Sequence, residues 1–372
     1  MATKSFDNAK KNKADEFYTQ WIDIEKEIQA YLEFNPNVFK DKTVLCPCDD
    51  PYESNFFKYF VLHFNALGLK KLIATCYTDS YTSNEQLTLI TGKAEDSKTT
   101  RVPCKIIISE VSDYNVDSRS DLTNVKWLLS NKKNALTHLE GNGDFRSEEI
   151  KDLRDEADFV ITNPPFSLFR EFMAWIMEAQ KQFLVISNMN AITYKEIFPL
   201  IKDNRMWMGL GFGRSFQGFI VPKSYPLNGS EARVDELGNR IVSTNNTIWL
   251  TNIDYARRHQ PLQLMTMEKN LKLSKHKVIR GKNNYDKYDN YDAIEVPFTD
   301  AIPSDYDGIM GVPISFLHKY CPEQFEIIKF RKGDDGKDLS VGGKCPYFRI
   351  LIRNKILQTT TTCAANSEVV AF

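Results

Sequence analysis

The tetrapeptide Asn163-Pro164-Pro165-Phe166 combines residue types that could bind and activate an aromatic amine. It follows the apolar run DFVIT (158–162), which predicts a strand, and it precedes a predicted helix. Open α/β sheets bind their ligands at this place, beyond the carboxyl ends of the strands. The two prolines make a stiff corner that fixes the Asn163 side chain and the Pro164 carbonyl in one direction.

The chemistry that suits this corner is transfer of a methyl group to an exocyclic base amine. Such an amine is a poor nucleophile because its lone pair is delocalised into the ring. Asn163 Oδ1 and the Pro164 carbonyl are neutral acceptors that could each take one amine hydrogen and leave the lone pair aimed at a methyl donor. Holding the two reactants in line is worth roughly 7–11 kcal/mol, and Phe166 offers a flat face on which a flipped base can stack. The alternative is a proline corner whose asparagine only caps the next helix.

Two other short segments carry residues suited to a cofactor. In GDFRS, Asp144 could accept a hydrogen bond from an adenine amine and Phe145 could pack on that adenine, although such a pair is more often a turn with a core aromatic residue. In CDDPYESN, Asp49 and Asp50 follow the first predicted strand. Adjacent acids at this turn repel phosphate, which argues against a dinucleotide. They favour the cationic sulfonium and amino group of S-adenosylmethionine, or its ribose hydroxyls.

The elements that must position these residues follow an alternating pattern. Apolar spacing predicts a helix over about 16–32, and Ser54 and Gly68 are placed to begin and end a second helix. Strands and helices then alternate, which predicts an α/β fold with a parallel sheet. The expected strands are TVLCPC (43–48), KLIATCY (71–77), CKIIIS (104–109), DFVIT (158–162) and FLVIS (183–187), followed by GFIVP, TIWLTN and LQLMTM as strands that complete the sheet. Helices are expected over SLFREFMAWIMEAQ and TYKEIFPLIKD, and FEIIKF and YFRILIR indicate a small mixed appendage.

Composition narrows the class of protein. The chain has 372 residues, of which 42% are hydrophobic and 26% charged, as in globular proteins. No apolar run is long enough to span a bilayer, and the polar N-terminus lacks the apolar stretch of a secretory signal, so we expect a cytoplasmic protein without membrane contact. The seven cysteines are favoured as reduced thiols over a disulfide framework, and Cys46, Cys48, Cys76 and Cys104 as buried residues over a metal site.

The net charge of −1 hides an uneven distribution. Residues 269–287 contain seven basic side chains and one acid, and we expect Lys272, Lys275, Lys277 and Arg280 to contact DNA. A charge run can also be only a solvated surface. The predicted organisation is a flexible basic arm (1–15), a catalytic domain (16–268, with an insertion at 78–135) and a DNA-recognition region (269–372).

Over most of its length the chain resembles the EcoRI-type adenine-specific DNA methyltransferases, the modification half of a restriction–modification pair. The resemblance rests on KADEFYTQ, FKDKTVLCPCDDPYESNFFKYF, LGLKKLIATCY, GNGDFRS, TNPPFSLFRE, NAITYKEIF, KYDNYDAIEV and DYDGIMGVPISFL. It implies a Rossmann-like fold that uses S-adenosylmethionine, with a C-terminal target-recognition appendage. The implied product is N6-methyladenine in double-stranded DNA, made on a flipped-out adenine, and the implied partner is a cognate restriction endonuclease that acts on the same site.

The resemblance also implies roles for single residues. Phe17, Tyr18 and Thr19 would contact the methionine end of the cofactor, and Asp49 or Asp50 would contact it after the first strand. Asp144 and Phe145 would bind its adenine, and Asn163, Pro164 and Phe166 would be catalytic. The chain departs from the wider superfamily at its first turn, because CDDPYESN replaces the usual glycine-rich sequence. Which of the two adjacent acids contacts the cofactor therefore stays open.

Other functions compete with this one. Pro47-Cys48 has the dipeptide of cytosine-C5 methyltransferases, but it lies at the expected cofactor strand and leaves the Asn163 motif unexplained. A cytosine-N4 or RNA-adenine methyltransferase uses the same amine chemistry. A glutamine-methylating enzyme gives no reason for the basic C-terminal third. A DNA-binding protein that kept the fold without catalysis gives no reason for an intact Asn163 and Phe166.

Overall fold

The computed structural model describes residues 18–51, 53–76, 103–112, 127–221, 227, 232–236, 238–243, 245–331, 338–346 and 348–357. They form two compact units, of which unit 1 comprises Met1–Ala191 and Met208–Asp254, and unit 2 comprises Ile192–Trp207 and Tyr255–Phe372. The expected arm (1–15) and most of the expected insertion (78–135) lie outside the described residues. The expected division at 268/269 falls inside unit 2 and stays a prediction.

Unit 1 is built on an eight-stranded sheet with β2 near its centre. The strands, in spatial order, are β5 (Ala135–His138), β4 (Cys104–Ile108), β3 (Lys71–Cys76), β2 (Thr43–Cys46), β6 (Phe159–Thr162), β7 (Gln182–Asn188), β12 (Thr247–Thr251) and β8 (Trp207–Phe212). Strands β3, β2, β6 and β7 are parallel, whereas β4 and β12 pair antiparallel with β3 and β7. All residues of β2, β6 and β12 are buried, as expected of strands covered on both faces. The α/β prediction is confirmed, and β4 shows that part of the expected insertion belongs to this sheet.

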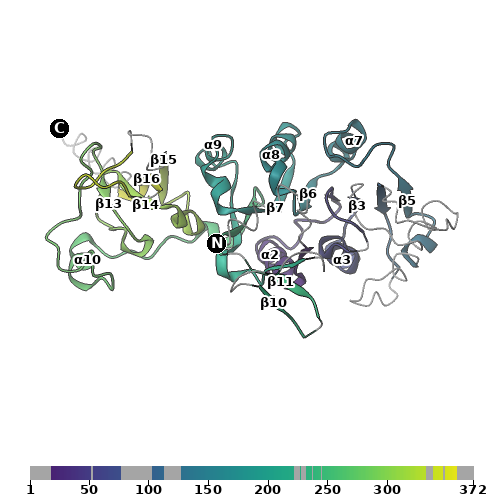
Figure 1. The fold of residues 1–372 in the computed structure, drawn as a ribbon, viewed down its shortest axis with the longest axis horizontal. Coiled ribbons are helices and arrows are strands. Elements are labelled where there is room, and N and C mark those ends of the chain that lie inside the picture. The colour runs from purple at the N-terminus through teal and green to yellow at the C-terminus, as the bar shows by residue number, and fades with distance from the viewer. Residues whose placement is uncertain are drawn as a thin grey trace, which may run out of the picture. The chain divides into compact units, whose positions relative to one another are not determined.

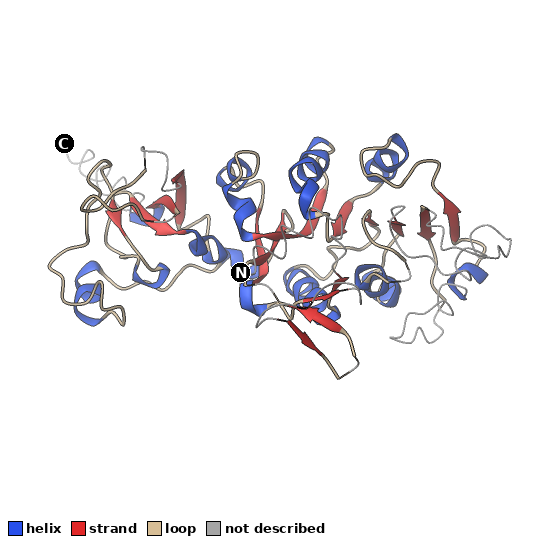
Figure 2. Ribbon diagram, in the orientation of Figure 1, coloured by secondary structure: helices blue, strands red, loops and turns tan. Residues whose placement is uncertain are grey.

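Helices cover both faces of this sheet (Figure 2). Figure 1 shows α2 (Trp21–Phe34) and α3 (Asn55–Leu62) on one side, and α7 (Glu148–Glu156) and α8 (Phe169–Glu178) on the other. The predicted cap is confirmed, because the Ser54 hydroxyl accepts hydrogen bonds from the N–H groups of Phe56 and Phe57 at the start of α3. The single predicted helix is two helices, because α3 ends at Leu62 and the short helix α4 (Phe64–Leu67) follows. The predicted end is confirmed: Gly68, with φ of 63°, closes α4, as a residue without Cβ can.

The first predicted helix begins later than expected. It starts at Trp21 rather than near residue 16, and Tyr18–Thr19 form strand β1. This strand pairs antiparallel with β9 (Phe219–Val221), in a second sheet of order β1-β9-β11-β10 that also contains β10 (Ala232–Val234) and β11 (Arg240–Val242). The spacing of apolar residues near Tyr18 could not predict this strand, because its pairing partner lies some two hundred positions away in the sequence.

Three other predictions are wrong in detail. GFIVP forms strand β9, but this strand belongs to the second sheet and does not complete the eight-stranded one. LQLMTM is not a strand, because residues 261–266 form an irregular segment that leads into helix α10 (Met267–Leu273). TYKEIFPLIKD is not one continuous helix: η2 (Met189–Thr193) is a 3-10 turn that ends at the start of this run, and the helix within it is α9 (Phe198–Lys202).

Unit 2 contains a four-stranded sheet of order β13 (Ile294–Glu295), β14 (Met310–Pro313), β16 (Arg349–Asn354) and β15 (Phe325–Arg331). Strand β15 is the predicted FEIIKF strand, and β16 overlaps the predicted YFRILIR strand. A small apolar cluster that includes Tyr288, Ala293, Leu339 and Leu351 packs within this unit. Among the helices of the described residues, none is both long and apolar enough to cross a membrane.

Candidate active site

The strand order of unit 1 reverses between β2 and β6. The chain leaves β2 toward β3 on one side and later returns to pair with β2 on the other side through β6. At such a reversal the two following loops diverge and open a ligand site. The register places Leu45 opposite Val160, so the segments that carry Asp49 and Asn163 leave the sheet side by side.

Asp49 follows the carboxyl end of β2 and is anchored there by hydrogen bonds from two elements. Its Oδ1 accepts from Ser54 Oγ at 2.6 Å, and its Oδ2 accepts from Thr162 Oγ1 at 2.5 Å. Its backbone N–H donates to the Thr75 carbonyl at 3.1 Å. Burial raises the pKa of Asp49 to about 6, although the two hydroxyl donors work in the opposite direction.

Asp50 lies beside a group of charged and hydroxyl side chains at the start of α3. The Tyr18 hydroxyl donates to the carboxylate of Glu53. Burial lowers the pKa of the nearby Lys58, while the negative charges of Glu53 and Asp50 oppose that change. The group therefore holds two carboxylates, one ammonium and one phenol at the turn after β2.

Strand β1 brings Thr19 to the same turn. Asn55 Nδ2, at the first position of α3, donates to the Thr19 carbonyl at 2.7 Å. The Thr19 side chain is 3% exposed, and its Oγ1 makes no hydrogen bond within the described part of the chain. A buried hydroxyl in that state costs free energy unless a ligand completes it.

The Asn163 corner has the form that its sequence predicts. Pro164 is buried, and Pro165 is extended with φ −61° and ψ 120° before a 3-10 turn, η1 (Phe166–Leu168). Asn163 is half-buried with a fully buried Oδ1. The half-buried Phe166 ring meets Phe219 of β9 edge to face, with 6.4 Å between ring centroids. The catalytic roles of Asn163, Pro164 and Phe166 stay predictions.

Asp144 and Phe145 lie in a more closed setting than a cofactor contact requires. Both carboxylate oxygens of Asp144 accept from the Arg146 guanidinium, at 2.9 and 2.6 Å, and this pairing holds the pKa of Asp144 below its usual range. The Phe145 ring is 4% exposed and packs edge to face on Phe172 and Trp175 of α8. Their cofactor roles stay predictions that the packing of Phe145 does not favour.

Three thiols lie at the same end of the sheet: Cys76 and Cys104 are buried, and Cys48 is half-buried. Burial raises the pKa of Cys48 far above its usual value, and the negative charges of Asp49 and Asp144 add to this effect. Cys76 and Cys104 are register partners on β3 and β4, and the Cys104 N–H donates to Cys76 Sγ at 3.2 Å. No cluster of three or more metal-ligating side chains occurs among the residues that the structure describes.

The predicted DNA-contacting residues lie in unit 2 and fall into two pairs. Lys272 pairs with Glu268 at 2.6 Å, one helical turn earlier in α10, and Lys275 pairs with Asp300 at 2.7 Å. Lys277 and Arg280 are exposed, and within the described ranges no acidic side chain pairs with either of them. Their contact with DNA stays a prediction.

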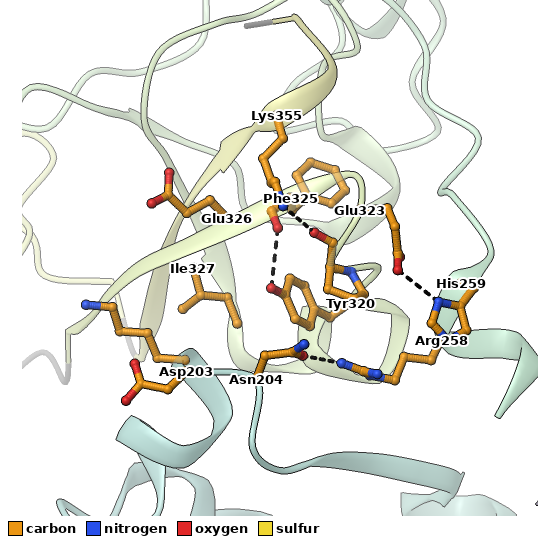
Figure 3. Close-up of a pocket in the computed structure, with 12 residues that line it drawn as sticks. Asp203, Asn204, Arg258, His259, Tyr320, Glu323, Phe325, Glu326, Ile327 and Lys355 are labelled. Carbon is orange, nitrogen blue, oxygen red and sulfur yellow. Dashed lines mark hydrogen bonds and ion pairs between the residues drawn. The ribbon is translucent and has the colours of Figure 1, made fainter. Parts of the chain in front are cut away.

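Unit 2 also contains a pocket of about 560 Å³, shown in Figure 3. The Arg258 guanidinium lies 3.6 Å from the centroid of Trp207 and donates to Asn204. His259 pairs with Glu323 at 2.9 Å. Partners from the chain thus already contact the Arg258 guanidinium and His259, and these contacts do not indicate a ligand.

Four residues near the ends of β2 and β6 were not predicted from the sequence: Ser54 as a partner of Asp49, and Thr162, Glu53 and Lys58. Thr162 carried no signal, because a threonine at a strand end is ordinary. Glu53 and Lys58 carried a weak signal, because they lie close to Ser54, the cap of the helix that follows Asp49 and Asp50.

Comparison with known proteins agrees with the resemblance seen in the sequence. The family model "Adenine-specific methyltransferase EcoRI" matches residues 5–355. The type II methyltransferase M.EcoRI of Escherichia coli is 49% identical over 95% of this chain and 98% of its own length. M.MpnI of Mycoplasma pneumoniae and M.MgeORF184P of Mycoplasma genitalium, both type II methyltransferases, are 32% and 31% identical over 94% of this chain and 98% of theirs. No solved structure matches the chain significantly. The chain therefore belongs to the EcoRI family of adenine-specific methyltransferases.

Proposed function

We propose that this adenine-specific DNA methyltransferase transfers the methyl group of S-adenosylmethionine to N6 of an adenine flipped out of duplex DNA. The observation that carries the proposal is the adjacency of two sites: the Asn163 corner after β6 and the acidic turn after β2 leave neighbouring parallel strands. A methyl donor in one site and a base amine in the other would meet between them. The same strand order supports our proposal that unit 1 has a Rossmann-like fold.

The residues at the turn after β2 fit S-adenosylmethionine. Thr19 Oγ1 is buried and lacks a hydrogen bond in the described chain, so it can accept from or donate to a ligand. Asp50 and Glu53 supply negative charge for the ammonium and sulfonium groups, and Lys58 supplies positive charge for the carboxylate. The bound donor would supply an activated methyl group on a positively charged sulfur.

The chain's own residues would then orient the acceptor. Asn163 Oδ1 and the Pro164 carbonyl each accept one hydrogen of the adenine amine, which directs its lone pair toward the methyl donor. Phe166 stacks on the purine, held by its contact with Phe219. No covalent bond to the enzyme is required, so the chain needs no nucleophilic cysteine. This agrees with the raised pKa values of Cys46 and Cys48, which keep these thiols protonated and unreactive.

Unit 2 would hold the duplex. Lys277 and Arg280 are the best candidates for phosphate contacts because no carboxylate competes for them in the described residues, whereas Lys272 and Lys275 must give up or share an acidic partner. We further propose that the enzyme works in the cytoplasm, where it would protect DNA from a cognate restriction endonuclease that recognises the same sequence.

The product decides this proposal. Purified protein is incubated with S-adenosylmethionine carrying a labelled methyl group and with duplex DNA of varied sequence, and the DNA is digested to nucleosides. We expect the label in N6-methyladenine. Label only in N4-methylcytosine, 5-methylcytosine or protein would refute the adenine assignment, and preference for RNA over duplex DNA would favour the RNA-adenine alternative.

A further inference from the structure

The two acids after β2 have different surroundings, and the difference assigns them different tasks. Each Asp49 oxygen receives a short hydrogen bond from a chain hydroxyl, Ser54 on one side and Thr162 on the other. The Asp49 side chain thus connects the cap of α3 with the last residue of β6. Asp50 instead lies near Lys58 and Glu53, within the polar group that suits a charged ligand.

Strand β6 needs such a connection at its end. Its ladder with β7 continues to Thr162, which pairs with Val185. Its ladder with β2 stops earlier, at Val160 opposite Leu45. On the β2 side, β6 is therefore fixed beyond its last ladder pair by the hydrogen bond from Thr162 Oγ1 to Asp49. Thr162 is the residue before Asn163.

The contact also has the properties of a strong restraint. Thr162 is fully buried and Asp49 is 5% exposed, so water does not compete for the hydrogen bond. A hydrogen bond to a charged acceptor is about twice as strong as one between neutral groups. Asp49 is in turn fixed by its backbone N–H, which donates to Thr75 on β3. The restraint reaches Asn163 through a single peptide unit.

We propose that Asp49 is a positioning residue that acts through Thr162 to fix the Asn163 corner, and that Asp50 is the acid that contacts the methyl donor. This inference rests on the proposed function, because it assigns parts to residues of that same site. It predicts that the two acids affect different kinetic quantities. Loss of the Asp49–Thr162 bond should slow the methyl transfer step at saturating substrates, whereas loss of Asp50 should weaken cofactor binding.

The first test replaces Thr162. Thr162→Val keeps the shape and removes the hydroxyl, and Thr162→Ser keeps the hydroxyl. In single-turnover methylation with saturating S-adenosylmethionine and DNA, we expect Thr162→Val to be slower by about tenfold or more, since a small misplacement of a reacting group can cost on the order of 100-fold. Thr162→Ser should stay within about threefold of wild type, because the bond to the charged acceptor is kept.

The matched control is Thr251→Val on β12. Thr251 is also a fully buried strand threonine with a hydrogen-bonded hydroxyl, which donates to the Phe183 carbonyl at 2.7 Å, but it lies three strands from β2. We expect this variant to lose stability in thermal unfolding without losing single-turnover rate. A Thr162→Val enzyme as fast as wild type, or Thr162→Ser and Thr251→Val enzymes as slow as Thr162→Val, would overturn the proposal.

The second test compares Asp49→Asn with Asp50→Asn and does not depend on Thr162→Val being folded. Calorimetry with S-adenosylhomocysteine gives the cofactor-site affinity, and single-turnover kinetics give the rate at saturation. We expect Asp50→Asn to lose more affinity than Asp49→Asn, and Asp49→Asn to lose more rate. The reverse order, or equal losses, would contradict the assignment. A wild-type protein that makes no methyladenine would instead refute the proposed function itself.

Discussion

Asn163 lies in a corner that Pro164 and Pro165 already fix, so its side chain can be changed with little risk to the fold. We expect Asn163→Ala to lower the single-turnover rate by on the order of 100-fold, as removal of one preorganised hydrogen-bonding group does in other active sites. Asn163→Asp keeps an acceptor of the same shape but adds negative charge near Asp49 and Asp50, so its rate should lie between wild type and Ala. Saturating cofactor and DNA keep binding defects out of the measured rate.

One result would contradict this prediction. A folded Asn163→Ala protein with a near-normal rate would show that the amine is oriented elsewhere, and the choice of active site would be wrong. Phe166 offers an independent check, because Phe166→Ala should lose base stacking worth about 1–3 kcal/mol, whereas Phe166→Tyr should be tolerated.

The structure bears on the predicted cofactor role of Asp144, because the Asp144 carboxylate already pairs with Arg146. If Asp144 binds the adenine of the cofactor, Asp144→Ala should weaken S-adenosylhomocysteine binding by about 1–3 kcal/mol in calorimetry. Arg146→Gln should then change the affinity little, because it leaves the carboxylate free for the ligand. Equal losses in both variants would mean that the pair only shapes the turn before α7.

At the scale of elements, helix α2 holds the two sheets of unit 1 through buried carboxylates. Glu27 is 1% exposed and accepts from the N–H groups of Leu210 and Gly211, each at 2.8 Å, and from the Tyr31 hydroxyl at 2.6 Å. Gly209 is required beside it, because a Cβ there would overlap the Glu27 carboxylate. Asp23, one turn earlier, accepts from the Gln217 N–H. The helix thereby fixes the end of β8 and the approach to β9, the strand that pairs with β1.

Asp23 should make the stability of this arrangement depend on pH. Burial raises its pKa from 3.8 to about 6, against the hydrogen bond from Gln217 and the charges of Lys26 and Arg233. The folded state then keeps a proton that the unfolded chain has lost. The stabilising contribution is fully present below about pH 4, is lost as pH rises toward about 6, and stays absent above it, with a total on the order of 3 kcal/mol.

Asp23→Asn removes this titration, so its unfolding free energy should fall less than that of wild type between about pH 4 and pH 7. Urea unfolding across that range measures the difference. Asp152→Asn, at an exposed position of α7, serves as the control and should run parallel to wild type. Parallel profiles for Asp23→Asn as well would mean that Asp23 titrates alike in the folded and unfolded chains.

The sequence predicted those elements whose signals are local. Ser54 and Gly68 mark a helix through their own backbone chemistry, and the apolar runs of β2, β6 and β7 need no partner to be recognised. Strand β1 was missed because two residues become a strand only by pairing with β9.

The same limit applies to the site. Asp49 and Asn163 could be singled out by residue type and position after a strand. The Asp49–Thr162 hydrogen bond could not, because it joins residues 113 positions apart and exists only if β6 pairs with β2. The LQLMTM segment shows the converse error, since alternating apolar residues suit an irregular segment that packs on a neighbour as well as a strand.

At the scale of the whole molecule, a net charge of −1 must still permit contact with a polyanion. The chain separates the charges: acids gather at the turn after β2 in unit 1, and basic residues gather over 269–287 of unit 2. Part of that basic charge is neutralised locally by Glu268, Asp300 and Asp286. The DNA-binding prediction therefore concerns the residues that these acids leave available.

We expect Lys277→Gln with Arg280→Gln to weaken duplex binding and to lower the slope of log Kd against log salt by about two, roughly one for each phosphate that the variant no longer neutralises. Lys272→Gln with Lys275→Gln should have a smaller effect, because each lysine must first share its carboxylate partner. Fluorescence anisotropy at several salt concentrations, with S-adenosylhomocysteine bound, gives both quantities. Lys195→Gln with Lys202→Gln, which removes two exposed charges of unit 2 outside the basic segment, is the control for net charge alone. If the Lys277–Arg280 double variant matches this control in affinity and slope, residues 269–287 are only a solvated surface and the duplex is held elsewhere.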